Sequence, residues 1–151
     1  QEDIEAISKS AENAIDEMVQ ISRYIKRKLA VLSPTTLVDF RKYYPESWQV
    51  FLDHKVKYIY NCIASNLESG IQEGLSREDL DVDVLAKIYV ARLEIFADNE
   101  VFPFHKYNVT KVYREFIRYH IRGIASPKGV EYLEQLKPEE EMLKKKNAEI
   151  Q

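Results

Sequence analysis

The chain has 151 residues, a formal net charge of −3 and a composition that is 45% hydrophobic and 31% charged. This length fits one domain, and this much apolar surface excludes a collagen-like, low-complexity or wholly disordered chain. The apolar runs are far shorter than the roughly 20 residues that cross a bilayer, and the acidic balance argues against a domain that itself holds DNA through its phosphates.

Cysteine usage and the first residues of the chain point to a cytoplasmic protein. Cys62 is the only cysteine, so no internal disulfide is expected, as is typical of a reducing compartment. The first nine residues carry three acidic side chains and no apolar stretch like that of a signal peptide. We therefore expect a cytoplasmic protein without contact with a membrane.

The first half of the chain predicts three helices. Apolar residues recur every three or four positions over 4–29, which predicts one long amphipathic helix. A Ser-Pro pair then starts a short helix over 34–44, since serine caps a helix and proline suits its first position. The next helix begins at Pro45 and runs for about eight turns to Gly74, because glycine forms the left-handed C-terminal cap without strain.

The second half predicts two apolar helices and a short one after them. The segment 81–98 is apolar around nearly its whole circumference, and the segment 108–124 has more than one apolar stripe. A helix that is apolar all round must be covered on both sides, so we expect a second copy of the chain to cover these two helices. Another Ser-Pro pair starts a short helix that ends at Leu136.

These elements predict an all-α protein that folds as an antiparallel bundle of about six helices. The sequence shows no internal repeat with a period of 20–50 residues and no linker between domains. We therefore expect a single domain over 1–137, with 138–151 as a charged C-terminal tail.

The sequence lacks the motifs of catalysis and of metal binding. The three histidines have no glutamate three residues away, as a di-iron bundle would require, and no glycine-rich phosphate loop is present. Cys62 lies within a helix and has no basic neighbour in sequence, which favours a structural thiol over a nucleophile. We expect neither an enzyme nor a metal or cofactor site.

The aromatic residues, ten Tyr, six Phe and one Trp, are the most informative side chains. A ring with one polar atom can pack into an apolar wall and also orient a ligand. We expect a mostly apolar cavity between the first helix, the 45–74 helix and the last two long helices. Ordinary core packing, or the contact between subunits, is the alternative for each candidate. The candidate lining residues are Trp48, Tyr58, Tyr89, Phe96, Tyr113 and His120.

Three segments resemble the TetR family of bacterial transcriptional regulators. The segment RGIASPKG over 122–129 is similar to the final helix pair of a Bacteroidetes-type subgroup. The segment KYYPESWQVF over 42–51 is similar to that subgroup's entry to its central helix. The third resembles the family's turn into a hydrophobic helix, and its matching residues are Gly70, Gly74, Leu75, Arg77, Asp79, Asp83 and Ala86.

The resemblance implies the effector-binding and dimerisation part of such a regulator, with a TetR C-terminal-domain-like fold. The family's DNA-binding helix-turn-helix would precede Gln1, so operator DNA would be contacted only through that domain. The resemblance also implies a homodimer, in which 81–98 and 108–124 of two copies form a four-helix interface. The candidate interface residues are Ile88, Arg92, Ile95, Val112, Phe116 and Tyr119.

Three classes of function remain open at this point. The first is a regulator, a repressor released by a small apolar or aromatic effector that changes the spacing of two DNA-reading heads. The second is an all-helical dimeric interaction or scaffold module that has no small-molecule ligand. A helical-bundle enzyme is the least supported, because the sequence lacks acid–base and metal motifs.

Overall fold

The structure is a computed structural model that describes residues 2–31, 39 and 42–136. Within these residues every regular element is helical, which confirms the predicted all-α class. The predicted helix over 34–44 lies largely outside the described residues, and the predicted tail over 138–151 lies wholly outside them. The helices are α1 (Glu2–Ser10), α2 (Ala14–Val31), α4 (Pro45–Gln72), α5 (Val82–Ala91), the 3₁₀ helix η1 (Glu94–Ala97), α6 (Val109–Ile124) and a last helix over 127–136.

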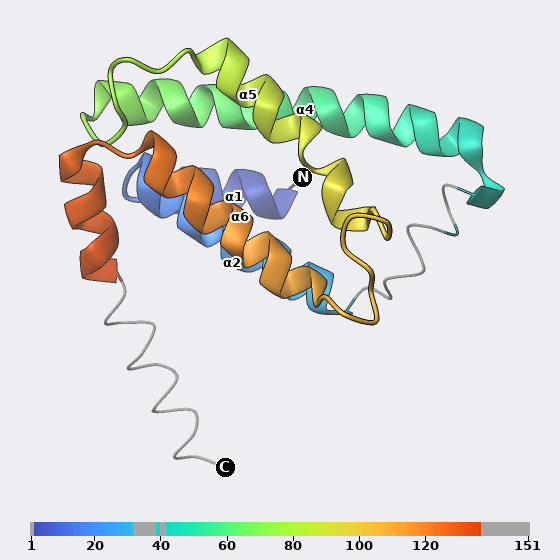
Figure 1. Cartoon of the computed structure of the whole chain (residues 1–151). Helices are drawn as coiled ribbons and strands as arrows, with labels where there is room; N and C mark the ends of the chain where they lie inside the picture. The colour runs from blue at the N-terminus through green and yellow to red at the C-terminus, as the bar shows by residue number, and fades with distance from the viewer. Residues whose placement is uncertain (1, 32–38, 40–41, 137–151) are drawn as a thin grey trace.

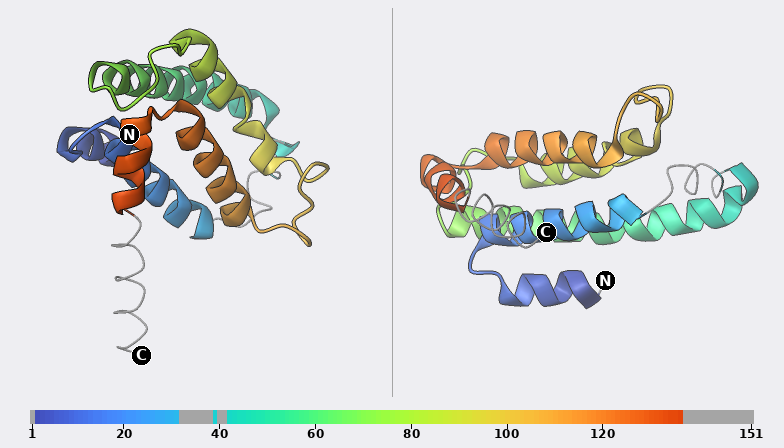
Figure 2. Two further views of the ribbon diagram at one scale, coloured as in Figure 1. Left: turned by 60° about the vertical axis from the view of Figure 1, so that its left-hand side comes forward. Right: turned by 90° about the horizontal axis from the view of Figure 1, so that it is seen from below.

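The helices form an antiparallel bundle, as predicted. In Figure 1, α5 lies along α4 and α6 lies along α2, and the last helix stands across one end of the bundle. Seen from below in Figure 2, α1 lies on the side of α2 opposite to α6. None of the described helices is both long enough and apolar enough to pass through a bilayer.

The predicted single helix over 4–29 is wrong, because the chain turns between α1 and α2. Asn13 Oδ1 accepts the backbone N–H of Asp16 at 3.0 Å and so caps the first turn of α2. The N–H of Ala14 donates to Glu73 Oε2 at 2.8 Å, which satisfies another free donor of the new helix. The apolar spacing continues across the turn, so periodicity alone does not reveal the break.

The predicted end of α4 is confirmed. Gly74 follows the helix with a φ of 70°, the left-handed conformation expected of a glycine cap. The N–H groups of Leu75 and Ser76 both donate to the carbonyl of Gly70, at 2.9 and 2.8 Å. These bonds satisfy the end of the helix and turn the chain back toward α5.

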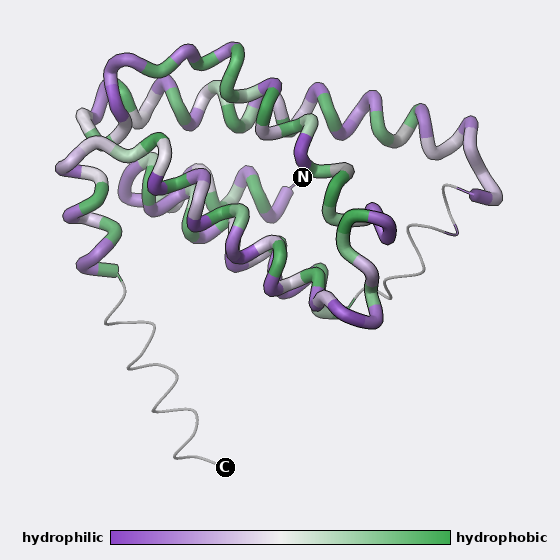
Figure 3. The backbone as a smooth tube through the Cα atoms, in the orientation of Figure 1, coloured by the Kyte–Doolittle hydropathy of each residue, from purple (hydrophilic) through white to green (hydrophobic). Residues whose placement is uncertain are grey.

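The predicted helix over 81–98 is too long, because the α-helix α5 ends at Ala91. Asp81 caps its start, with Oδ1 accepting the N–H of Val84 at 3.0 Å. Beyond the helix, the N–H of Leu93 donates to the carbonyl of Val90 at 3.0 Å, a tighter three-residue spacing that continues into η1. The hydrophobic run is therefore divided between an α-helix and a 3₁₀ helix. Figure 3 colours its apolar residues green along α5 and η1.

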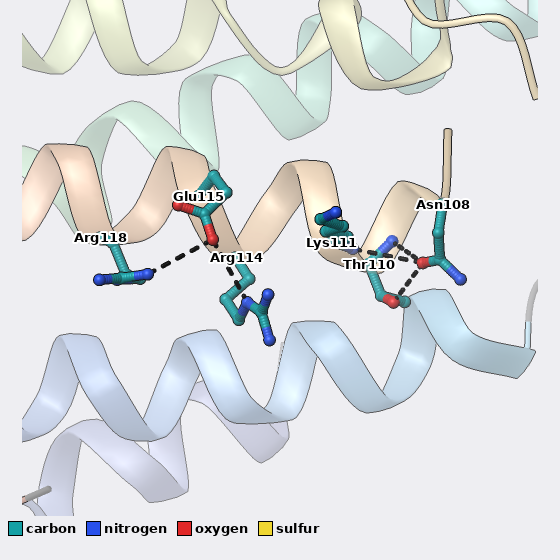
Figure 4. Close-up of polar contacts among 6 residues, drawn as sticks. All are labelled: Asn108, Thr110, Lys111, Arg114, Glu115 and Arg118. Atoms are coloured by element: carbon teal, nitrogen blue, oxygen red, sulfur yellow. Dashed lines mark hydrogen bonds and ion pairs between the residues drawn. The ribbon is translucent and has the colours of Figure 1, made fainter. Parts of the chain in front are cut away.

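The predicted start of α6 is confirmed. Asn108 Oδ1 accepts the backbone N–H groups of Thr110 and Lys111 at 2.9 and 3.2 Å, which makes Asn108 the N-cap (Figure 4). The predicted short helix also begins after its Ser-Pro pair, and Ser126 Oγ accepts the N–H of Gly129 at 3.1 Å.

Segments 70–77 and 122–129 pair with each other, and we call this pairing the turn junction. Ser76 and Ala125 form an isolated antiparallel bridge. The N–H of Ser126 donates to the carbonyl of Leu75, and the N–H of Arg77 donates to that of Ile124, both at 2.9 Å. The turn junction thus ties the turn that follows α4 to the end of α6 and the turn that follows it.

Candidate ligand site and subunit interface

Five rings from α5, η1 and α6 contact one another, and we call this group the aromatic cluster: Tyr89, Phe96, Tyr113, Phe116 and His120. The Tyr89 ring centroid lies 4.8 Å from that of His120 and 5.2 Å from that of Phe116. The Phe96 centroid lies 5.7 Å from that of Tyr113. These are the separations of tilted and edge-to-face ring pairs, so the rings fill the space between α5 and α6.

Helical spacing explains how the cluster forms. Tyr113 and His120 are seven residues apart on α6, with Phe116 between them, so that all three share one side of that helix. Tyr89 lies on α5, whereas Phe96 lies in η1. The four predicted pocket residues of the last two long helices are therefore brought together, and Phe116 joins them.

Two polar atoms of the cluster are buried without a hydrogen bond among the described residues: the Tyr113 hydroxyl and His120 Nε2. Tyr113 is only 2% exposed. The Tyr89 and Tyr113 hydroxyls are close enough that each shifts the pKa of the other. Their geometry is nevertheless not that of a hydrogen bond, so the Tyr113 hydroxyl has no partner among the described residues. Since most buried polar atoms find a partner, two such atoms in one cluster are unusual.

Burial sets the charge states of these groups. Burial in the apolar cluster raises the pKa of Tyr89 to about 12 and raises that of Tyr113 as well. Burial also lowers the pKa of His120 to about 4, and the nearby positive charge of Arg92 acts in the same direction. At neutral pH the aromatic cluster is therefore uncharged, which suits a neutral ligand.

The two candidates on α4 lie outside the aromatic cluster. Trp48 and Tyr58 are both half-buried, and neither takes part in the ring contacts of the described cluster residues. Partial burial and the neighbouring thiol of Cys62 raise the pKa of Tyr58 to about 12, with a smaller contribution from Glu5 of α1.

A second feature is a set of exposed apolar side chains on α5, η1 and α6, which we together call the α5–α6 face: Val84, Ile88, Ile95 and Tyr119. Tyr119 is 67% exposed, and the Arg92 guanidinium lies 5.5 Å from the centre of its ring. Three predicted interface residues, Ile88, Ile95 and Tyr119, are on this face. Val84 belongs to the same face, and its exposure could not be read from a segment that is apolar all round.

The other three predicted interface residues are half-buried rather than exposed. Phe116 is half-buried and contacts the rings of Tyr89, Phe96 and His120, so it belongs to the aromatic cluster. Val112 is also half-buried. Arg92 lies between the two features, since it stacks on Tyr119 and its charge reaches His120.

No group of three His, Cys, Asp or Glu side chains in the described part of the chain is arranged to hold a metal ion. Cys62 is a half-buried free thiol. Comparison of the chain with known protein families, curated proteins and solved structures gives no match.

Proposed function

We propose that this chain is the effector-binding and dimerisation part of a TetR-like DNA-binding transcriptional regulator, a repressor released by a small apolar or aromatic effector. The observation that carries this proposal is the aromatic cluster with its two unpartnered polar atoms, the Tyr113 hydroxyl and His120 Nε2. Leaving a buried polar atom without a partner costs about 1–3 kcal/mol. A ligand with an aromatic body and one oxygen would stack on the rings and remove that cost.

The position of the cluster supports a regulatory role for such a ligand. The rings of the cluster come from α5, η1 and α6. The same three elements carry the exposed side chains of the α5–α6 face. A ligand inserted between the rings changes the separation of α5 and α6, and with it the geometry of a dimer that uses this face. A ligand that favours one of two dimer geometries shifts their populations and thereby the spacing of attached DNA-binding domains.

The proposal is tested by thermal unfolding in the presence of small neutral phenols and aromatic ketones. A ligand that binds only the folded state raises the melting temperature as its concentration increases. At 100 times its dissociation constant it adds about 2.7 kcal/mol to the free energy of unfolding. The matched variants are Tyr113→Phe, which removes the buried hydroxyl, and Tyr132→Phe, which removes a hydroxyl that donates to Glu12. We expect the first variant to weaken the response and the second to leave it unchanged.

A dimeric interaction module without a ligand is the second candidate, and the α5–α6 face is the observation that favours it. This alternative predicts dimers in solution and no saturable thermal shift with any compound of the series. That result would reject the effector proposal.

A further inference from the structure

The charges of the chain are unevenly distributed over its helices. The whole chain has 25 acidic and 22 basic residues, and its net charge is −3. The second half of α2, residues 20–31, nevertheless contains four basic residues and no acidic one. Helix α6 contains four basic residues and a single acidic residue, Glu115. These two segments are therefore strongly positive, although the chain as a whole is acidic.

The two positive segments lie side by side. Helices α2 and α6 are in contact and run in opposite directions, so the second half of α2 lies beside the first half of α6 (Figures 1 and 2). In Figure 4 the side chains of Arg114 and Arg118 extend from α6 toward α2. Lys111 shares this side of α6, because residues three or four positions apart on a helix lie on one face.

The basic residues of α2 are directed toward the same region. Tyr24 of α2 donates to Asp3 of α1 at 2.9 Å, and α1 lies on the side of α2 opposite to α6. Lys26 is two positions from Tyr24 and therefore lies on the other side of the helix, toward α6. We call the row of cations on the two helices the basic strip: Arg23, Lys26, Arg27, Lys111, Arg114 and Arg118.

The basic strip is open to solvent, and much of its charge is not neutralised within the described chain. One member is half-buried and the other five are exposed. Lys26, Arg27 and Lys111 form no ion pair with any described residue. Glu115 makes only long ion pairs with its neighbours on α6, at 3.4 and 3.5 Å, compared with about 2.7–2.9 Å for a close charged pair.

Helix stability explains the positive charge of α2 but not that of α6. The dipole of a helix stabilises cations near its C-terminal end, which is where the basic residues of α2 are found. The first turn of α6, by contrast, contains Lys111 and no acidic residue, although the N-terminal end of a helix disfavours cations. The neighbouring cations of α2 add to this repulsion. The basic strip therefore fits an anionic partner outside the chain better than a role in folding.

The residue types of the strip indicate the chemistry of this partner. Four of its six members are arginine, whose planar guanidinium can pair with two phosphate oxygens at once. The cations follow two straight helices, which suits a linear polyanion better than a small anion. Tyr24, the aromatic residue nearest to Lys26, is directed toward Asp3 and covered by Lys28, so its ring is not offered to an unpaired base. These features match the backbone of a nucleic-acid duplex.

We infer that the basic strip binds the phosphate backbone of duplex DNA without regard to sequence. The proposed function assigns the operator to separate DNA-binding domains, so this is an additional contact made by the chain itself. The inference rests on the proposed function only in its choice of DNA, because attached domains would hold the chain beside a duplex. The acidic residues elsewhere do not prevent binding, since exposed charges are screened beyond about 8–10 Å at physiological salt.

The test is a titration of a fluorescently labelled DNA duplex of arbitrary sequence with the 151-residue chain, followed by anisotropy at several salt concentrations. We expect a dissociation constant of about 10⁻⁴–10⁻⁶ M at physiological salt and tighter binding at about 50 mM, because the release of counterions drives such binding. If about four cations contact phosphates, the logarithm of the association constant falls with the logarithm of the salt concentration with a slope of about −3.6.

Matched variants locate the contact. Lys26→Gln and Arg114→Gln each remove one cation of the basic strip at an exposed position. Each variant weakens binding and makes the salt slope shallower by about one. Lys57→Gln, at an exposed position of α4, makes the same change in charge outside the strip and leaves the affinity and the slope unchanged.

Three outcomes would overturn the inference. The first is no binding of the duplex at about 50 mM salt. The second is an equal response to Lys57→Gln and Arg114→Gln. The third is tighter binding to vesicles of phosphatidylserine and phosphatidylcholine than to the duplex, which would assign the strip to a membrane surface.

The outcomes also separate this inference from the proposed function. Each of the three leaves the effector proposal intact, because the thermal test with aromatic compounds contains no DNA. Conversely, a chain that binds the duplex through the basic strip but shows no thermal shift keeps the strip and rejects the effector.

Discussion

His120 lies in the aromatic cluster with its Nε2 atom buried, the Tyr89 ring 4.8 Å away and the charge of Arg92 nearby. Burial is the main reason that its pKa falls to about 4, and Arg92 adds to the effect. In the unfolded chain the imidazole has a pKa near 6.5. The folded protein therefore binds fewer protons than the unfolded chain between these two values.

Acidification consequently destabilises the fold through His120. We expect the free energy of unfolding to decrease as the pH falls below about 6.5, with a loss of up to about 3 kcal/mol by pH 4 from this residue. Urea unfolding at pH 7, 6 and 5 measures this slope. His120→Leu should flatten it, and His105→Leu, at an exposed loop position, is the matched control. Equal slopes in wild type and His120→Leu would contradict the assignment.

The structure brings together four of the predicted pocket residues, and one predicted interface residue, Phe116, joins them. Tyr113 and His120 share a helix face by their spacing, and this could be read without a structure. Phe116 shares this side of α6, and its ring contacts those of Tyr89, Phe96 and His120. Tyr58 takes no part in the ring contacts of the cluster, since helical phase shows which side of a helix a residue occupies, but not which neighbouring helix lies against it.

At the scale of elements, the turn junction contains residues from two of the three segments that resemble the TetR family. Arg77 holds Asp79 at 2.6 Å and donates to the carbonyl of Gly123 at 3.0 Å. Ser126 Oγ donates to the carbonyl of Gly74 at 2.7 Å. These motif residues shape the backbone at the junction. Their pairing could not be predicted from periodicity, because hydrogen bonds between distant turns leave no periodic pattern.

Gly129→Ala tests how far the fold depends on the turn junction. The added Cβ would collide with the backbone carbonyl of Leu75, which cannot move away as a flexible side chain would. We expect the free energy of unfolding to fall by about 1–3 kcal/mol, the range for overpacking. Urea unfolding measures the loss, with Gln135→Ala on the exposed side of the same helix as the control. A loss below about 0.5 kcal/mol would show that the junction adapts easily.

The helices themselves were predictable where local chemistry marks their ends. Gly74 and Asn108 mark an end and a start through side-chain or backbone preferences that are visible in the sequence. The turn at Asn13 was missed, since the apolar spacing continues across it. The end of α5 was missed as well, because a change from α-helical to 3₁₀ pitch leaves hydrophobic residues on both sides of it.

For the whole molecule, the separation between the α5–α6 face and the aromatic cluster predicts two different consequences of introducing a charge. Ile88 is 41% exposed, so Ile88→Glu leaves the fold intact and abolishes a dimer that covers this side chain. Phe116 contacts three rings, so Phe116→Glu destabilises the monomer by about 3 kcal/mol or more. Sedimentation and circular dichroism together distinguish the outcomes. An Ile88→Glu variant that remains dimeric would exclude this face as the interface.

The turn junction also limits how α5 and α6 can move relative to each other. It joins segments 52 positions apart at one end of the bundle, while residues 98–107 connect the same helices at the other end (Figure 1). The segments that carry α5 and α6 are therefore held to each other at both ends, by hydrogen bonds at the junction and by the continuous chain near Asp98. A bound molecule that widened the space among the aromatic rings would have to bend or shift these helices between two fixed ends.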